Sequence, residues 1–98
     1  MSAYSVARIA ESDLKSILRY TLKTWGRAQT RRYSNGLREC FDLLAERPSL
    51  GRRCDSIRPG LRRFEHCKHV VFYIAQSDEI LIVRVLHQQM IPAKSHFE

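Results

Sequence analysis

Apolar residues in the first half of the chain recur at the spacing of two amphipathic helices. Over residues 14–25 they stand three or four positions apart, which places them on one face of a helix. A second stripe of the same kind occupies residues 33–44. Gly26 is expected to end the first helix and Pro48 to close the second, because proline cannot continue the helical hydrogen-bond ladder. A weak alternation over residues 3–9 predicts a short strand before the first helix.

After residue 60 the apolar positions become typical of β-strands. β-Branched and aromatic residues dominate residues 61–67, 70–75 and 80–86, and short polar breaks separate these segments. Residues 48–60, with their prolines and glycines, are expected to form a connecting loop. The predicted order is therefore β-α-α-β-β-β, an α+β fold whose last three strands form an antiparallel meander.

The last two predicted strands are apolar at nearly every position, which indicates that both of their faces are covered. Two helices can cover only one face of so small a sheet. The other face is therefore expected to be kept for a partner.

Composition excludes several classes of protein. The chain has 98 residues, of which 44% are hydrophobic, and this is typical of one folded domain over residues 1–98. The longest apolar run, residues 70–75, is far shorter than the ~20 residues that span a bilayer, so no membrane partner is expected. The first residues lack the apolar core of a secretory signal, and the three cysteines are an odd number. We therefore expect a cytoplasmic protein with reduced thiols.

The charge of the chain points to an anionic partner. There are 17 Lys and Arg residues against 10 Asp and Glu, a formal net charge of +7. Residues 47–68 alone contain seven basic side chains and two acidic ones. Such a surface suits nucleic acid, a membrane surface or an acidic protein, and it can also serve only to keep a protein soluble.

A set of residues spread along nearly the whole chain gives it a family resemblance. In order, they are Asp13, Leu14, Ile17 and Tyr20, Trp25 and Gly26, Leu43, Leu44, Ala45 and Pro48, Leu50, Gly51 and Arg52, Arg58, Gly60, Leu61 and Arg62, residues 69–73, and Ile80, Ile82, Val85, Leu86 and His87. Their order and spacing resemble those of the ParE branch of the RelE/ParE toxin superfamily, the small basic toxins of bacterial type II toxin–antitoxin modules. The resemblance implies a helical hairpin packed on one face of a small twisted antiparallel sheet.

The resemblance also implies a function and its partners. It implies an inhibitor that binds DNA gyrase, traps the enzyme on cleaved DNA and needs neither catalysis nor a cofactor. The expected partners are therefore DNA gyrase, the gyrase-bound DNA, and a cognate ParD-like antitoxin that silences the toxin in a toxin–antitoxin hetero-oligomer. An acidic, amphipathic antitoxin segment would match a surface of charge +7 and would cover the spare face of the sheet.

Candidate contact residues follow from these expectations. For the antitoxin they are apolar residues on the uncovered faces, with one arginine to pair an acidic side chain: Leu14, Leu18, Phe72, Ile74, Ile80, Ile82 and Arg84. Strand alternation would place Arg84 on the same face as Ile80 and Ile82. For the target, the high local density of positive charge favours Arg58, Arg62 and Arg63.

Two other functions stay open. RelE-like relatives of the same fold cut messenger RNA with basic residues and often a tyrosine or histidine near the end of the last strand. The corresponding stretch of this chain offers only Arg84 and His87 for that chemistry. The other alternative is a basic nucleic-acid-binding module that uses residues 47–68.

No metal site is expected. The soft ligands available near the strands are Cys54, His66, Cys67, His69 and His87. Strand alternation would put Cys67 and His69 on one face and His66 on the other, and the spacings typical of zinc sites are missing.

Overall fold

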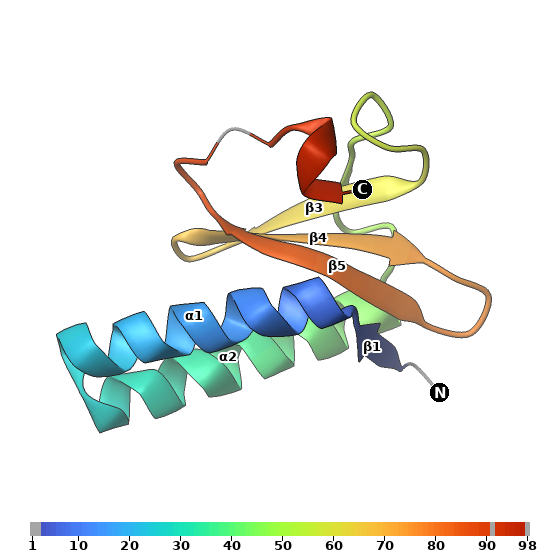
Figure 1. Ribbon diagram of the computed structural model, residues 1–98. Helices are drawn as coiled ribbons and strands as arrows, with labels where there is room; N and C mark the ends of the chain where they lie inside the picture. The colour runs from blue at the N-terminus through green and yellow to red at the C-terminus, as the bar shows by residue number, and fades with distance from the viewer. Residues whose placement is uncertain (1–2, 91, 98) are drawn as a thin grey trace.

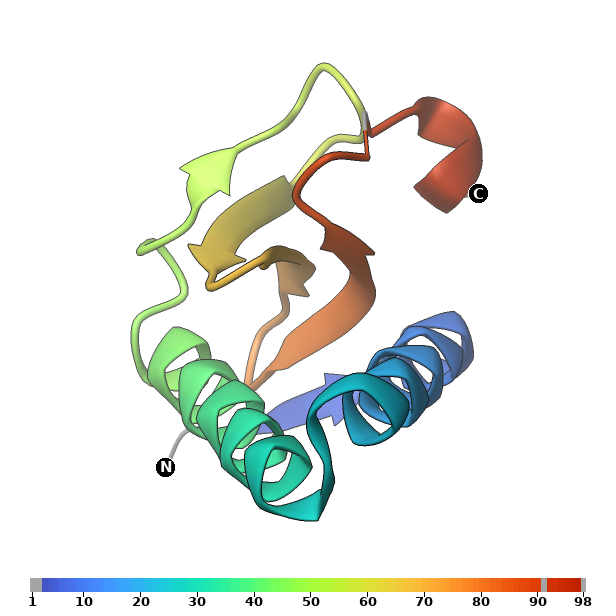
Figure 2. The ribbon, with the colours of Figure 1, turned by 90° about the vertical axis from the view of Figure 1, so that its left-hand side faces the viewer.

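The computed structural model describes residues 3–90 and 92–97, which form a helical layer and a sheet (Figure 1). In chain order the elements are β1 (Tyr4–Val6), α1 (Arg8–Trp25), α2 (Arg27–Glu46), β2 (Arg52–Arg53), β3 (Leu61–His66), β4 (His69–Ala75), β5 (Ile80–His87) and the 3-10 helix η1 (Lys94–Phe97). The two helices run side by side along one face of the sheet (Figures 1 and 2). The predicted α+β architecture, a helical hairpin on one face of a small sheet, is confirmed.

A single residue joins the two helices. Gly26 has a φ of 86°, a conformation that favours glycine, and α2 begins at the next residue. The Gly26 amide donates to the Leu22 carbonyl at the end of α1, and its carbonyl accepts from the Thr30 amide in α2. The second helix therefore begins earlier than the apolar stripe over residues 33–44 predicts, because its first turns are polar and exposed.

The sheet is mixed, with the strand order β1-β5-β4-β3-β2. The predicted antiparallel meander is confirmed for β3, β4 and β5, but β1 pairs in parallel with β5. Two residues of the predicted loop form β2 at the opposite edge, where Arg52 and Arg53 pair with Arg63 and Arg62 of β3. Sequence periodicity misses both features, because strand direction at an edge and a two-residue strand depend on the tertiary neighbours.

The face of the sheet turned towards the helices forms the larger part of the core. Its central side chain is Tyr73, which is fully buried. Val71, Ile80, Ile82 and Val85 surround it from β4 and β5. Burial on this face follows from the apolar stripes of both helices, which pack against it.

The opposite face of the sheet is covered by the chain itself, so the expectation of a face kept for a partner is wrong. Phe97 of η1 lies over Phe72, with ring centroids 4.9 Å apart in an edge-to-face arrangement. Cys54 and Ile57 from the loop after β2 complete this second cluster. A 3-10 helix of four residues carries almost no signal in the sequence, and this is why the cover was not foreseen. No helix of the described residues is long and apolar enough to cross a bilayer.

Candidate functional site

An apolar groove runs between α1 and α2 beside β1. One part of it, of about 180 Å³, is lined by Tyr4, Val6, Leu14, Leu18, Ser34, Leu37, Arg38 and Phe41. A second part, of about 320 Å³, lies towards the hairpin turn and is lined by Leu18, Leu22, Arg27, Thr30, Arg31, Ser34 and Asn35. Leu18 and Ser34 belong to both parts, so the two form one continuous groove.

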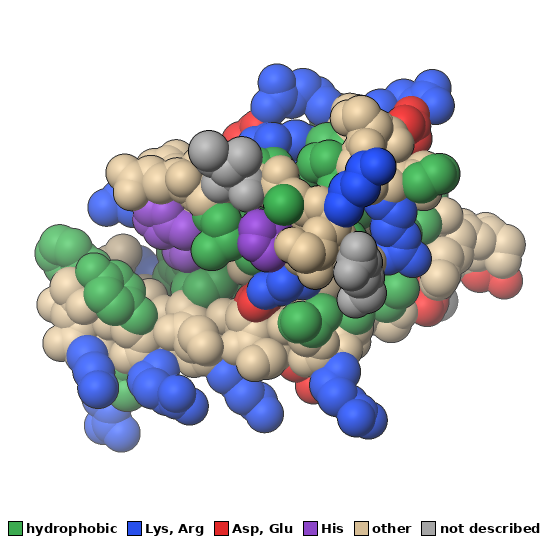
Figure 3. Space-filling view, turned by 45° about the horizontal axis from the view of Figure 1, so that its top comes forward, with side chains coloured by type: hydrophobic (Ala, Val, Ile, Leu, Met, Phe, Trp, Pro, Cys, Tyr) green, Lys and Arg blue, Asp and Glu red, His purple; other side chains and the backbone are tan. Residues whose placement is uncertain are grey.

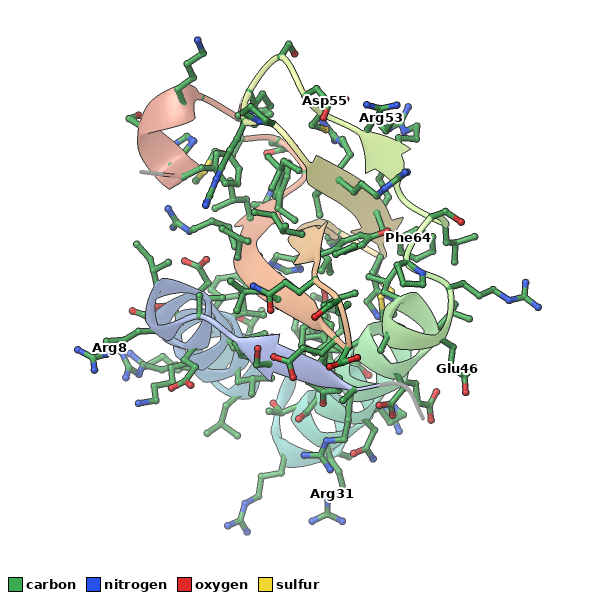
Figure 4. The ribbon with its side chains drawn as sticks, turned by 90° about the vertical axis from the view of Figure 1, so that its right-hand side faces the viewer. Arg8, Arg31, Glu46, Arg53, Asp55 and Phe64 are labelled. Carbon is green, nitrogen blue, oxygen red and sulfur yellow. The ribbon has the colours of Figure 1, made fainter. Side chains whose placement is uncertain are left out.

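The groove has an apolar floor and a cationic rim. Leucines of both helices make the floor, while Arg27, Arg31 and Arg38 of α2 contribute the rim. Figure 4 shows Arg31 extending from α2 away from the rest of the molecule. The rim arginines are exposed, and none of them forms an ion pair with a described residue. This arrangement suits a partner segment that is apolar on one side and acidic on the other.

Of the residues predicted to contact an antitoxin, Leu14 and Leu18 lie in the groove and are partly exposed. Phe72, Ile80 and Ile82 do not lie on an open face, since 1%, 0% and 0% of their surfaces are exposed. Ile80 and Ile82 are covered by the helices, and Phe72 is covered by η1. Those three assignments are therefore corrected to core positions. Ile74, which is partly buried, packs against the second cluster.

Arg84 was expected to be free for an acidic partner, but it is already paired within the chain. Its Nε and Nη2 donate to the two carboxylate oxygens of Asp13, each at 2.8 Å. Its Nη1 donates to the His96 carbonyl in η1 at 3.1 Å. The side chains of Arg84 and Asp13 are only 15% and 13% exposed. The hydrogen bond to Asp13 is the main reason why the pKa of Arg84 is raised.

A β-bulge explains why strand alternation misplaced Arg84. The register of β4 and β5 shifts between Phe72 and Tyr73, which pair with Arg84 and Ile82 and leave Val83 without a partner. The extra residue ends the alternation that would put Arg84 beside Ile82. The Asp13 carboxylate also accepts a hydrogen bond from the Val85 amide at 3.0 Å. Val85 lies on the edge of β5 beyond the residues that pair with β1, so Asp13 takes the place of a strand partner there.

The three arginines predicted to contact the target lie near one another along the chain but do not form one surface. Arg62 and Arg63 point to opposite faces of β3, as neighbours in a strand do. Arg62 donates to the carbonyls of Ser49 and Gly51. Arg63 lies over the Phe72 ring, with its guanidinium carbon 5.6 Å from the ring centroid.

Arg58, the third of these arginines, donates to the Phe97 carbonyl at 3.3 Å and so holds η1 in place. Neighbouring arginines are paired as well, since Arg52 pairs with Glu65 and Arg53 pairs with Asp55. Figure 4 shows Arg53 and Asp55 next to each other at this edge. Most arginines of residues 47–68 therefore already form ion pairs or hydrogen bonds with other groups of the chain.

Three histidines meet at one end of the sheet, beneath α2. His66 pairs across the strands with His69, and His69 pairs with His87, so all three point to the same face. The prediction that His66 lies opposite to His69 is wrong, because Cys67 and Lys68 form the tight turn between β3 and β4 and reverse the chain.

Tyr33 of α2 packs against this histidine cluster, with its ring 5.9 Å from that of His66 and 5.6 Å from that of His69. Its hydroxyl hydrogen-bonds to Nδ1 of His69, and burial, with smaller contributions from Cys67 and Cys40, raises the pKa of Tyr33 to about 12. The Tyr33 hydroxyl therefore keeps its proton at neutral pH. Burial, followed by the nearby His87 and His66, lowers the pKa of His69. Figure 3 shows the histidines gathered between the sheet and the helical layer.

The alternative catalytic pair, Arg84 and His87, is not brought together. Arg84 is engaged with Asp13 and η1, whereas the His87 ring packs against His69 with centroids 5.5 Å apart. Among the residues that the structure describes, no group of three His, Cys, Asp or Glu side chains is placed to hold a metal ion.

Sequence reasoning missed the α2 side of the groove, although Leu37 and Phe41 stand four apart on the second apolar stripe.

Comparisons with known proteins find similar chains of nearly the same length. The family model described as ParE toxin of type II toxin-antitoxin system, parDE, matches residues 4–92. Toxin ParE1 of Mycobacterium tuberculosis is 38% identical over 90 residues, which cover 91% of this chain and 92% of that protein. Toxin ParE of Escherichia coli is 39% identical over 93 residues, which cover 92% of this chain and 88% of that protein.

A solved structure shares the fold. A chain described as belonging to the chromosomal ParDE TA system from P. aeruginosa superposes with a TM-score of 0.73 and 21% sequence identity. The superposition covers 89% of this chain and 96% of that one. The two helices and the sheet are therefore arranged alike in both chains.

Proposed function

This chain belongs to the ParE toxin family of type II toxin–antitoxin systems, and we propose that it inhibits DNA gyrase by binding and is neutralised by a ParD-like antitoxin. The observation that carries the proposal is the family match, which spans both helices and all five strands. The proposed target places the action of the protein in the cytoplasm. Gyrase and the DNA that it holds are then the partners of the free toxin, and the antitoxin is its partner in a hetero-oligomer.

The groove between α1 and α2 is the proposed antitoxin site. Leu14 and Leu18 line an apolar floor, and Arg31 and Arg38 provide positive charge at the rim. An acidic amphipathic segment can bury its apolar side chains in the floor and place its carboxylates at the rim. The proposal thus keeps two of the residues predicted from the sequence and replaces the buried ones with the α2 side of the groove.

Substitution of Leu18 tests the antitoxin site. An aspartate there would put an unpaired charge between two parts of the groove, so Leu18→Asp should weaken antitoxin binding at least tenfold in a calorimetric titration. Leu43→Asp is the matched control, because Leu43 is 38% exposed on α2 and does not line the groove. Unchanged affinity of the Leu18 variant, with both variants folded by circular dichroism, would contradict this site.

A plasmid assay tests the activity. Purified chain, gyrase and supercoiled plasmid should accumulate cleaved plasmid, and an equimolar amount of the cognate antitoxin should prevent the cleavage. A ribosome-dependent messenger RNA assay on the same preparation should show intact message. Cut message with intact plasmid would refute gyrase inhibition and would favour the RelE-like alternative.

For the gyrase contact, the proposal keeps the three arginines predicted from the sequence. Because Arg62 and Arg63 point to opposite faces of β3, the partner would have to contact them around the edge of the sheet that β2 forms. Arg58 is exposed, and the other two are partly exposed, so a partner can reach their guanidinium groups. Substituting all three by glutamine should reduce plasmid cleavage about tenfold or more, since each charged contact in an interface is worth roughly a few kcal/mol. A control variant removes the same number of positive charges from exposed basic residues elsewhere in the chain. The tested and control sets are R58Q/R62Q/R63Q and R32Q/R47Q/K94Q.

Cleavage that falls only in the first set supports the assignment, and cleavage that falls equally in both sets would contradict it. Arg58 and Arg62 also donate hydrogen bonds to the carbonyls of Phe97 and Gly51, so their substitution can lower stability. The melting temperature of each variant must therefore be measured beside the assay.

A further inference from the structure

A charge equal to the net charge of the chain lies in the half of the helical hairpin next to its turn, over residues 14–38. Residues 14–38 contain seven Lys and Arg side chains and no Asp or Glu. The other ten basic side chains of the protein are balanced by its ten acidic ones. Residues 14–38 therefore carry a charge equal to the whole net charge of +7, although local density along the sequence points to residues 47–68. The two helices as a whole hold eight basic and five acidic side chains, because the acids lie in the first turns of α1 and the last turns of α2.

None of the cations of residues 14–38 pairs with an acidic side chain that the structure describes, unlike the arginines at the edge of the sheet. All four ion pairs found among the described residues belong to Arg52, Arg53, Arg63 and Arg84, and none involves α2. The single side-chain hydrogen bond from a hairpin cation to a polar group joins Arg32 to Gln29, as far as residues 3–90 and 92–97 are concerned. Free cations keep their full attraction for an external anion.

The four basic side chains of α1 form a row, which we call the α1 ridge: Arg8, Lys15, Arg19 and Lys23. Their spacing of seven, four and four residues places them on one face of the helix, and all four are exposed. Neighbouring cations four residues apart lie about 6 Å apart along the helix axis, and the row spans about 22 Å. Figure 3 shows basic side chains along the outer face of the helical layer, and Figure 4 shows Arg8 pointing away from the molecule.

The α1 ridge differs in composition from the groove. Its neighbours on the outer face are the small hydroxyl residues Ser12 and Ser16 and one acid, Glu11, which stands between Arg8 and Lys15. Leu14 and Leu18 lie on the flank next to α2. Two exposed apolar side chains, Tyr20 and Leu22, flank the ridge, but the positions of the ridge itself are cationic. Lys, Arg and Ser are residue types that contact phosphate oxygens of nucleic acids.

We infer that the α1 ridge binds the phosphate backbone of duplex DNA. Its row of cations is long enough to follow several phosphates of a duplex. The choice of DNA rests on the proposed function, which brings the chain to gyrase and its DNA. The ridge and the groove meet at Leu22, which lines the groove and lies one turn from Arg19; none of the four ridge cations lines the groove.

Binding to a labelled duplex of about 20 base pairs, measured by fluorescence anisotropy with the purified chain alone, tests this inference. With four phosphate contacts, the logarithm of the association constant should fall by about 3 to 4 per tenfold rise in salt concentration. The variant K15Q/R19Q/K23Q should bind at least tenfold more weakly and lower this slope by about 3. The control R47Q/R52Q/R53Q removes the same charge from exposed arginines near the sheet edge and should change affinity less than threefold.

Equal losses in the two variants would overturn the inference, because net charge alone would then explain binding. Tighter binding of single-stranded RNA or of a poly-glutamate peptide than of the duplex would also overturn it. The plasmid assay separates this inference from the proposed function. A chain that binds duplex DNA through the ridge but does not poison gyrase would refute the function and leave the inference standing, and the reverse result would refute the inference alone.

Discussion

Replacing Asp13 by alanine should destabilise the protein more than any surface substitution, because three hydrogen bonds depend on its carboxylate. Asp13 accepts from Nε and Nη2 of Arg84 at 2.8 Å and from the Val85 amide at 3.0 Å. Without it, the guanidinium keeps only the His96 carbonyl, and the Val85 amide loses its acceptor. Breaking a buried ion pair by removing one partner costs about 3 to 5 kcal/mol. Because the pair is slightly exposed, we expect a loss of about 3 kcal/mol.

Urea unfolding followed by circular dichroism measures this loss directly. The free energy of unfolding should fall with an unchanged dependence on urea, and the melting temperature should drop by roughly 12 to 25 °C for a domain of this size. Arg84→Met in the Asp13→Ala background removes the orphaned charge and should recover part of the loss. The double variant should therefore be more stable than the sum of the two single losses by about 1 kcal/mol or more. A loss below about 1 kcal/mol for Asp13→Ala, or strictly additive losses, would refute the argument that burial makes this pair costly to break.

Three further predictions follow from single side chains. Tyr73→Phe removes a buried hydroxyl that donates to the Pro48 carbonyl and accepts the Gly51 amide, so unfolding free energy should fall by about 1 to 3 kcal/mol in a urea titration. Phe97→Ala uncovers the second face of the sheet and should cost roughly 3 kcal/mol, with increased binding of a hydrophobic dye; an unchanged melting temperature would show that η1 does not cover this face. The pKa of His69 is lowered in the folded protein, so near and below the unfolded pKa of about 6.5 the unfolded chain binds more protons, and the free energy of unfolding decreases as the pH is lowered. Between pH 7.5 and pH 5 the melting temperature should therefore decline less in His69→Gln than in the original protein, and parallel declines would refute the role of His69.

The candidate site was only partly predictable, and particular residues show why. Leu14 and Leu18 were found from their helical spacing, which is a local property of α1. Arg84 was misplaced because a bulge in β5 changes its face, and a bulge depends on the pairing of two strands. Its partner Asp13 is 71 residues away along the chain, a separation at which no spacing rule applies.

The charge of the hairpin was present in the sequence, but its significance was not. Counting along residues 14–38 finds seven cations and no acid. Counting along residues 47–68 finds a denser cluster. Only the folded chain shows that Arg52 and Arg53 form ion pairs, whereas no cation of the α1 ridge does so with a residue in 3–90 or 92–97.

The sequence by itself determined the two helices, the three central strands and the family, because hydrophobic periodicity and residue order are properties of near neighbours along the chain. Tertiary structure alone decided that β1 runs parallel to β5, that η1 closes the second face of the sheet, and that Asp13 holds Arg84. Each of these contacts joins residues far apart in the sequence. Their free energy comes from burial and pairing that exist only once the helices and the sheet have come together.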